Sequence, residues 1–205
     1  MNQTPRITGN IRIYLILLTL LLTANTHLMA QPDKNSQSAY ILVAHPDLND
    51  PRYKQSVILV MAHMGSNAIG VILNKPMPIL LDYYFPNEPI ATEHSEPVFY
   101  GGPVSDNAYT FLIHSEIQPK PTLSVIDNYW LGVDSKLLFK ALDNQIDLEK
   151  LRIYKGYSGW APGQLESEIN HGLWYILPAE AEQLLSDAPE LMWQTLIEQI
   201  NKDWI

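Results

Sequence analysis

The chain has 205 residues, of which 46% are hydrophobic and 17% charged. This balance excludes an intrinsically disordered protein, which carries fewer apolar residues and more charge. Cysteine is absent, so disulfides, thiolate zinc sites and a cysteine nucleophile are excluded. The formal net charge of −9 argues against direct DNA binding, because contacts with phosphate need clustered Lys and Arg.

Residues 1–30 have the layout of a targeting segment. Arg6 and Arg12 are its only charged residues, and twelve uncharged residues follow at positions 13–24. That run is short for a permanent membrane span, which needs about 20 residues, but it suits the apolar core of a signal peptide. Ala30 offers a small residue for cleavage, although Leu28 is larger than usual at its position. An uncleaved membrane tether through residues 13–24 is therefore the second interpretation.

These features predict an exported protein, either periplasmic or tethered to a membrane. The alternative is that translation starts at Met29, which would make the protein cytoplasmic. Residues 31–38 are polar and lack apolar periodicity, so they predict a linker. The folded domain is then expected to span residues 39–205.

The rest of the chain consists of short apolar runs interrupted by Pro, Gly and Asn, and Pro76 is interpreted as a strand breaker. Strands are expected at residues 40–44, 56–62, 68–73, 98–100, 109–114, 151–157 and 173–177. Helices are expected at residues 79–85, 135–142, 162–171, 179–186 and 189–202. Residues 65–67 predict a hairpin loop, and Asp134 and Asp187 are expected to cap two of the helices. Most strands precede most helices without regular alternation, which predicts an α+β domain.

Two local patterns resemble catalytic motifs. Residues 156–160, Gly-Tyr-Ser-Gly-Trp, begin like the nucleophile elbow of serine hydrolases, but Trp160 stands where the elbow needs a glycine. Ser158 is therefore a poor candidate nucleophile. In the helix after it, Gln164, Glu168 and His171 share one face and could form an acid–base or metal site. We favour a solvated polar face, with Glu166 complementing the helix dipole.

The six histidines give no metal-binding motif, because no two of them are spaced as i, i+2 or i, i+4. Gly101 and Gly102 could let backbone amides approach an anion. The Lys-Ser/Thr of a phosphate loop is absent after them, so a tight turn between strands is the better interpretation. No catalytic residue, metal or cofactor is predicted.

Several of these segments are matched, in order, by a known family: residues 41–46, 50–53, 56–58, 68–76, 101–104, 114, 156–160 and 163–166, and the strand around Trp174. Taken together they resemble the YqgE/AlgH family of bacterial proteins. No single motif is specific, but the ordered set spans residues 39–205. The resemblance implies a single compact α+β domain with a mixed, largely antiparallel sheet, packed helices and a C-terminal helix.

The resemblance brings no enzymatic activity, cofactor or catalytic residue with it. Members are often described as transcriptional regulators, but an exported, acidic protein fits that description poorly. We therefore expect a non-enzymatic domain that binds a protein or a small molecule. A cytosolic transcriptional regulator is the alternative, and an unrecognised enzyme is the third hypothesis.

The candidate binding residues are those in the matching segments that stand at strand ends and turns. They are Asn74, Lys75, Gly101, Gly102, Trp160, Gln164 and Glu166. If the segments converge, Trp160 would form an apolar wall while Lys75, Gln164 and Glu166 orient a ligand. The alternative is that the glycines only permit turns, Trp160 fills the core and Glu166 stabilises its helix.

A charge in the middle of residues 13–24 tests the targeting segment. Insertion of a central arginine costs about 2.5–3.5 kcal/mol, so we expect Leu18→Arg to abolish export. Fractionation of cells expressing each form measures this. Recovery of the variant outside the cytoplasm at the wild-type level would contradict the signal interpretation.

Overall fold

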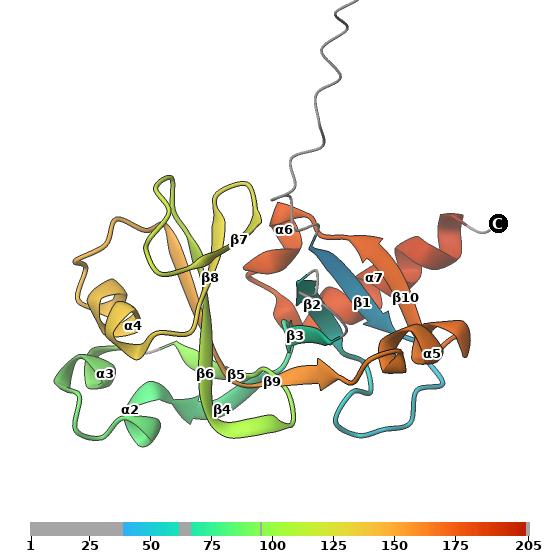
Figure 1. The fold of residues 1–205 in the computed structure, drawn as a ribbon, viewed down its shortest axis with the longest axis horizontal. Helices are drawn as coiled ribbons and strands as arrows, with labels where there is room; N and C mark the ends of the chain where they lie inside the picture. Colours follow the sequence, from blue (N-terminus) through green and yellow to red (C-terminus); the bar gives the residue numbers. More distant parts are fainter. Residues whose placement is uncertain (1–38, 62–66, 95, 204–205) are drawn as a thin grey trace, which may run out of the picture. The chain divides into compact units, whose positions relative to one another are not determined.

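The domain is built on one large, curled sheet with helices packed against its faces (Figure 1). The strands are β1 (Tyr40–Ala44), β2 (Val57–Met61), β3 (Ala68–Ile72), β4 (Pro76–Leu80), β5 (Pro97–Tyr100), β6 (Val104–His114), β7 (Leu123–Ile126), β8 (Tyr129–Gly132), β9 (Lys150–Trp160) and β10 (Trp174–Pro178). The helices are α2 (Leu81–Tyr84), α3 (Pro89–Glu93), α4 (Ser135–Leu142), α5 (Gln164–Asn170), α6 (Ala181–Leu184) and α7 (Pro189–Asp203).

The structure is a computed structural model that describes residues 39–61, 67–94 and 96–203. The described residues all belong to one compact unit. The expected targeting segment and linker, and most of the expected hairpin loop at residues 65–67, lie outside the described residues. In the ranges described, no helix has both the length and the apolar character to cross a membrane.

The strands follow the order β10-β1-β2-β3-β9-β6-β8-β7 across the sheet. Neighbours on this path pair antiparallel, whereas β5 runs parallel to β9 beside it. The prediction of an α+β domain with a mixed, largely antiparallel sheet and a C-terminal helix is therefore confirmed.

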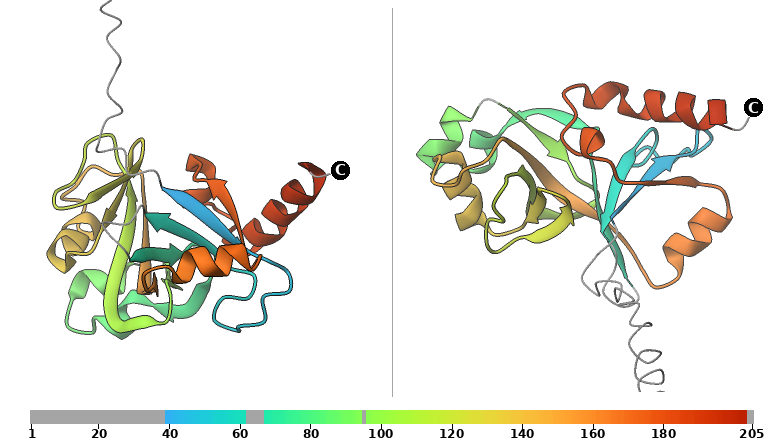
Figure 2. Two further views of the ribbon diagram at one scale, coloured as in Figure 1. Left: turned by 45° about the vertical axis from the view of Figure 1, so that its right-hand side comes forward. Right: turned by 90° about the horizontal axis from the view of Figure 1, so that it is seen from above.

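The strands β1 and β2 are covered on both faces, and so is β3 except at Ile69, which explains their continuous apolar sequences. On one face, Val43 and Leu59 belong to a core that includes Leu196 of α7. On the other face, Leu42 packs in a cluster with Leu165 of α5. Figure 2 shows α7 and α5 on opposite sides of these strands.

The other half of the sheet shares one of these cores and has a third of its own. Leu112 of β6 and Leu131 of β8 belong to the same core as Leu59 and Leu196, which we call the interior core. On the opposite face of β6, Phe111 packs with residues of α2, α3 and α4, including Leu138. We call this second group the outer cluster.

One strand, β9, joins the two halves of the sheet. Its first residues pair with β6, and its last three pair with β3. Gly101 bridges the two halves: its N–H donates to the Lys155 carbonyl oxygen at 2.8 Å, and its own carbonyl oxygen accepts from the Ile72 N–H at 3.0 Å. A Cβ atom at Gly101 would overlap the carbonyl oxygen of Gly156, and one at Gly102 would overlap the backbone of Tyr157. Glycine is therefore required where these two segments cross.

Several elements differ from the sequence predictions. The structure places β4 at Pro76–Leu80, where Pro76 was expected to break the chain. Among the described strands it pairs with β5 alone, and proline is tolerated on a strand of that kind because its unpaired side needs no N–H donors. The hairpin of β7 and β8 was missed; its turn includes Asp127 with a φ of 38°, a conformation that Asp tolerates better than most residues.

The two expected helix caps have different outcomes. The Asp134 carboxylate accepts from the Leu137 N–H at 2.8 Å, so this cap of α4 is confirmed. The cap expected at Asp187 is wrong, because α7 begins at Pro189 and the Asp187 carboxylate instead accepts from Lys150 Nζ at 2.8 Å.

Replacing Gly101 tests the crossing. The variant Gly101→Ala puts a methyl group against the Gly156 backbone, so we expect the free energy of unfolding to fall by about 1–3 kcal/mol or more. Gly159→Ala in the same region is the matched control, because its new Cβ would meet no atom closer than 3.5 Å. Urea denaturation of both variants measures the difference. Equal stabilities would contradict the proposed role of the crossing.

Candidate functional site

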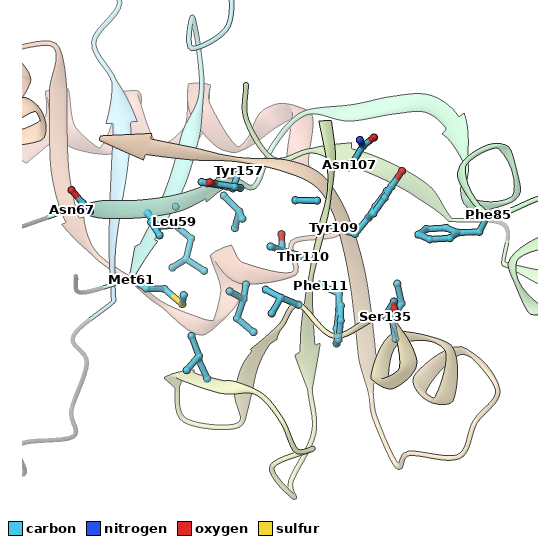
Figure 3. Close-up of a pocket in the computed structure, with 18 residues that line it drawn as sticks. Leu59, Met61, Asn67, Phe85, Asn107, Tyr109, Thr110, Phe111, Ser135 and Tyr157 are labelled. Atoms are coloured by element: carbon cyan, nitrogen blue, oxygen red, sulfur yellow. The ribbon is translucent and has the colours of Figure 1, made fainter. Parts of the chain in front are cut away.

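A pocket of about 730 Å³ lies between β3 and β6 and is the strongest candidate site (Figure 3). Its walls come from β2, β3, β6, β8 and the start of α4, including Leu59, Val71, Thr110, Leu131 and Ser135. None of its eighteen described lining residues carries a charged side chain. The pocket therefore suits an apolar, uncharged group.

The pocket extends around β6 and touches both faces of that strand. Thr110 has the same orientation as Leu112, because side chains two residues apart in a strand point to the same face, and Leu112 belongs to the interior core. Tyr109 and Phe111 belong to the outer cluster. In Figure 3, Thr110 and Tyr109 accordingly extend to opposite sides of β6.

The pocket exists because β8 is shorter than β6. Strand β8 pairs with β6 only from Phe111 to His114, and its last residue, Gly132, stands opposite Phe111. Beyond Gly132 the chain passes through Val133 into α4. The residues of β6 before Phe111 therefore have no strand beside them on that side, in the part of the chain that the structure describes.

Apolar side chains form part of the pocket's lining even where they are exposed to solvent. Ile69 and Leu123 are each 50% exposed and Val133 is 69% exposed, and all three line the pocket. Inside it, Thr110 is only 7% exposed, and its hydroxyl has no hydrogen-bond partner among the described residues. Exposed apolar residues gathered at a concave site are typical of a binding surface.

The residues predicted at the turn after β3 mainly serve the structure. The Asn74 side chain is buried, accepts from the Val57 N–H at 2.8 Å and donates to the Gln55 carbonyl oxygen at 2.9 Å. Lys75 Nζ donates to the Arg52 carbonyl oxygen at 2.8 Å. Burial lowers the pKa of Lys75, and the nearby carboxylate of Asp50 acts in the opposite direction.

The residues predicted at the start of α5 surround a carboxylate that the sequence analysis had assigned to a solvated face. Glu168 accepts from the indole N–H of Trp160 at 2.9 Å and from that of Trp174 at 2.8 Å. Its other oxygen accepts from the Gln164 side chain at 2.9 Å. Trp160 is buried, whereas Glu166 lies exposed in the first turn of α5. The prediction of a solvated polar face is therefore wrong for Glu168, which ties α5 to two strands.

The seven predicted residues are not brought together around the large pocket, and none of them lines it. Gly101 and Gly102 lie at the crossing, Trp160 and Gln164 meet at Glu168, and Lys75 lines a separate pocket of about 390 Å³ with Arg52 and Tyr100. A binding role for these residues stays a prediction. The pocket residues were missed because their exposure depends on where β8 ends, which no local pattern signals.

The two motifs weighed as catalytic have structural explanations. Ser158 is fully buried within β9, where its hydroxyl donates to the Gly101 carbonyl oxygen at 3.3 Å. The strand continues through Trp160, so the sharp turn of a nucleophile elbow is not formed. Across the described ranges, no three His, Asp or Glu side chains lie close enough together to hold a metal ion.

Comparisons with known proteins agree on one family. A family model described as AlgH-like (DUF179) matches residues 41–205. A UPF0301 protein of Myxococcus xanthus is 33% identical over 80% of this chain and 90% of its own length. One from Streptomyces avermitilis is 34% identical over 80% of this chain and 86% of its own.

Solved structures share the fold. The solution structure of the AlgH protein from Pseudomonas aeruginosa has a TM-score of 0.67 and 24% identity, covering 83% of this chain and 91% of that protein. The crystal structure of a protein from Corynebacterium diphtheriae has a TM-score of 0.66 and 20% identity, covering 86% of this chain and 94% of that protein.

The buried hydroxyl of Thr110 gives a prediction about the free protein. Thr110→Val removes a hydroxyl without a described partner while keeping the shape, so we expect the free energy of unfolding to stay unchanged or to rise by up to about 1 kcal/mol. Thr122→Val is the control, because the Thr122 hydroxyl donates to the Pro119 carbonyl oxygen and its loss should lower stability. Thermal denaturation measures both. A marked loss of stability in Thr110→Val would show that its hydroxyl is bonded.

Proposed function

This chain belongs to the AlgH-like family, and we propose that it is a non-enzymatic binding protein that takes an apolar ligand into the pocket around β6. The observation that carries the proposal is the pocket itself, with a volume of about 730 Å³ and no charged side chain in its described lining. Pockets of about 300–1,000 Å³ with mainly apolar walls are typical of small-molecule and cofactor sites.

The polar groups of the pocket support binding rather than catalysis. Its described walls include hydroxyl and amide side chains such as Thr110, Ser135 and Asn107. These groups can orient a ligand by hydrogen bonds. General acid–base catalysis near neutral pH most often uses a His, Asp, Glu or Lys side chain within reach of the substrate, and none of these is among the described residues that line this pocket.

Export of the protein, with or without a membrane tether, belongs to the same proposal. It is supported by the two arginines and the apolar run within residues 1–30. The alternative of a cytosolic transcriptional regulator has little support from the charges described: Arg52 pairs with Asp50 at 2.6 Å and Lys150 with Asp187 at 2.8 Å. These ion pairs reduce the positive charge that Arg52 and Lys150 can offer to a DNA phosphate.

An uncharged fluorescent probe, N-phenyl-1-naphthylamine, tests the pocket directly. We expect it to bind the wild-type protein with increased fluorescence. Ile69→Asp places a carboxylate among the lining residues and should weaken binding about tenfold or more, because the charge must stay hydrated beside an apolar ligand. Fluorescence titration measures the dissociation constants.

Ile176→Asp is the matched control for this experiment. Ile176 has the same 50% exposure as Ile69 and also lies on an antiparallel strand, but it is on β10 and does not line the pocket. Binding should be unchanged in that variant. Absence of binding to the wild-type protein, or equal weakening in both variants, would contradict the proposed function.

A further inference from the structure

We infer that the natural occupant of this pocket is an extended apolar segment of a partner polypeptide, which pairs with the open edge of β6 as an added strand. The inference rests on the proposed function, because the pocket that holds the ligand would hold the side chains of this segment. Three features carry it: the direction of the β6 backbone, the shape of the pocket and the cost of covering that backbone.

The backbone of Tyr109 faces the open side of β6. The Ser115 N–H donates to the Asn128 carbonyl oxygen on the β8 side, and the His114 carbonyl oxygen accepts from the Glu149 N–H on the β9 side. In an antiparallel strand the backbone groups of successive residues alternate between the two sides. Pairing with β9 is regular from Tyr109 to His114, so Tyr109 faces the same side as Ser115.

On that side, Tyr109 stands just beyond the end of β8. The ladder of β6 and β8 stops with Phe111 opposite Gly132. No backbone partner is found for Tyr109 on that side within the described ranges. A strand added there would continue the line of β8 and extend an interface that the domain already contains. Addition of an extended peptide to an exposed strand edge is an established mode of recognition.

The pocket lies on both faces of β6, as an added strand requires. Leu59 and Leu131 line its part on the interior core, and Phe85 and Leu138 line its part on the outer cluster. Side chains of a strand alternate between the two faces of a sheet. A segment paired with β6 would therefore place successive side chains in the two parts of the pocket, one after the other.

Desolvation favours a peptide over a small apolar molecule. An apolar molecule that filled the pocket would remove water from the N–H and C=O groups of Tyr109 without replacing their hydrogen bonds, and this is costly. A peptide backbone supplies both a donor and an acceptor. The absence of charge in the described lining indicates that the inserted side chains are uncharged.

The test uses a capped peptide with a Val-Leu-Val-Leu core between Ser-Lys pairs, which keep it soluble. We expect this peptide to displace N-phenyl-1-naphthylamine from the wild-type protein and from Ile176→Asp, but weakly or not at all from Ile69→Asp. Amide hydrogen exchange, followed by NMR on the full chain, then reports on the backbone. The Tyr109 amide should exchange about tenfold more slowly, or slower still, when the peptide is bound.

The probe alone has no backbone to pair with Tyr109, so it should slow the exchange of that amide much less than the peptide does. The Phe111 amide, which lies within the existing ladder, should be protected in every state and serves as the internal control. Displacement without protection of Tyr109, or no displacement by the peptide, would overturn the added strand while leaving the pocket's function intact. Protection of Tyr109 that rises with protein concentration alone would identify a second copy of the chain as the occupant and would also overturn the inference.

Discussion

The close approach of Gly101 and Gly102 to the backbone at Gly156 is the constraint on which the rest of the structure depends. It lets one strand, β9, pair with β6 in its first part and with β3 in its last. Gly156 has a φ of +69° at this point, a conformation that glycine adopts at little cost. A side chain at Gly101 would have to occupy the space of the Gly156 carbonyl oxygen.

The candidate site follows from this arrangement. Because both halves of the sheet share β9, residues from β2 and β3 and residues from β6 and β8 contribute to one interior core. That core is not closed along its whole length, since β8 ends at Gly132 while β6 continues past it. The pocket occupies the resulting opening and reaches both faces of β6. Several residues of its apolar walls are therefore also residues of the interior core.

The sequence predicted those parts of the fold whose cause is local. The runs at β1, β2 and, apart from Ile69, β3 are apolar because both faces are covered, and Asp134 is followed by a helix whose N–H group it caps. The strand β4 was missed because its two prolines, Pro76 and Pro78, are unfavourable in a paired strand, and the position of β4 beside a single described neighbour makes them acceptable. Such a position is a property of the whole sheet.

The same distinction separates the predicted site residues from the pocket. Asn74, Trp160 and Gln164 were singled out by their place in the sequence, and the structure gives them partners within the fold. Ile69 stands in an expected strand, and no local pattern distinguishes Leu123 or Val133, so their exposure depends on how the strands are assembled. Hydrophobicity patterns indicate which residues are apolar, but not which of them the finished sheet leaves uncovered.

A map of backbone amide shifts on adding N-phenyl-1-naphthylamine to the isotope-labelled protein would test the central claim most directly. If the ligand occupies the pocket around β6, the largest changes should fall on both of its faces, at Leu59 and Val71 in the interior core and at Phe111 and Leu138 in the outer cluster. Changes centred instead on Lys75, Gln164 and Glu166, with β6 unaffected, would contradict the account. They would indicate a binding site at the turn after β3 and the start of α5.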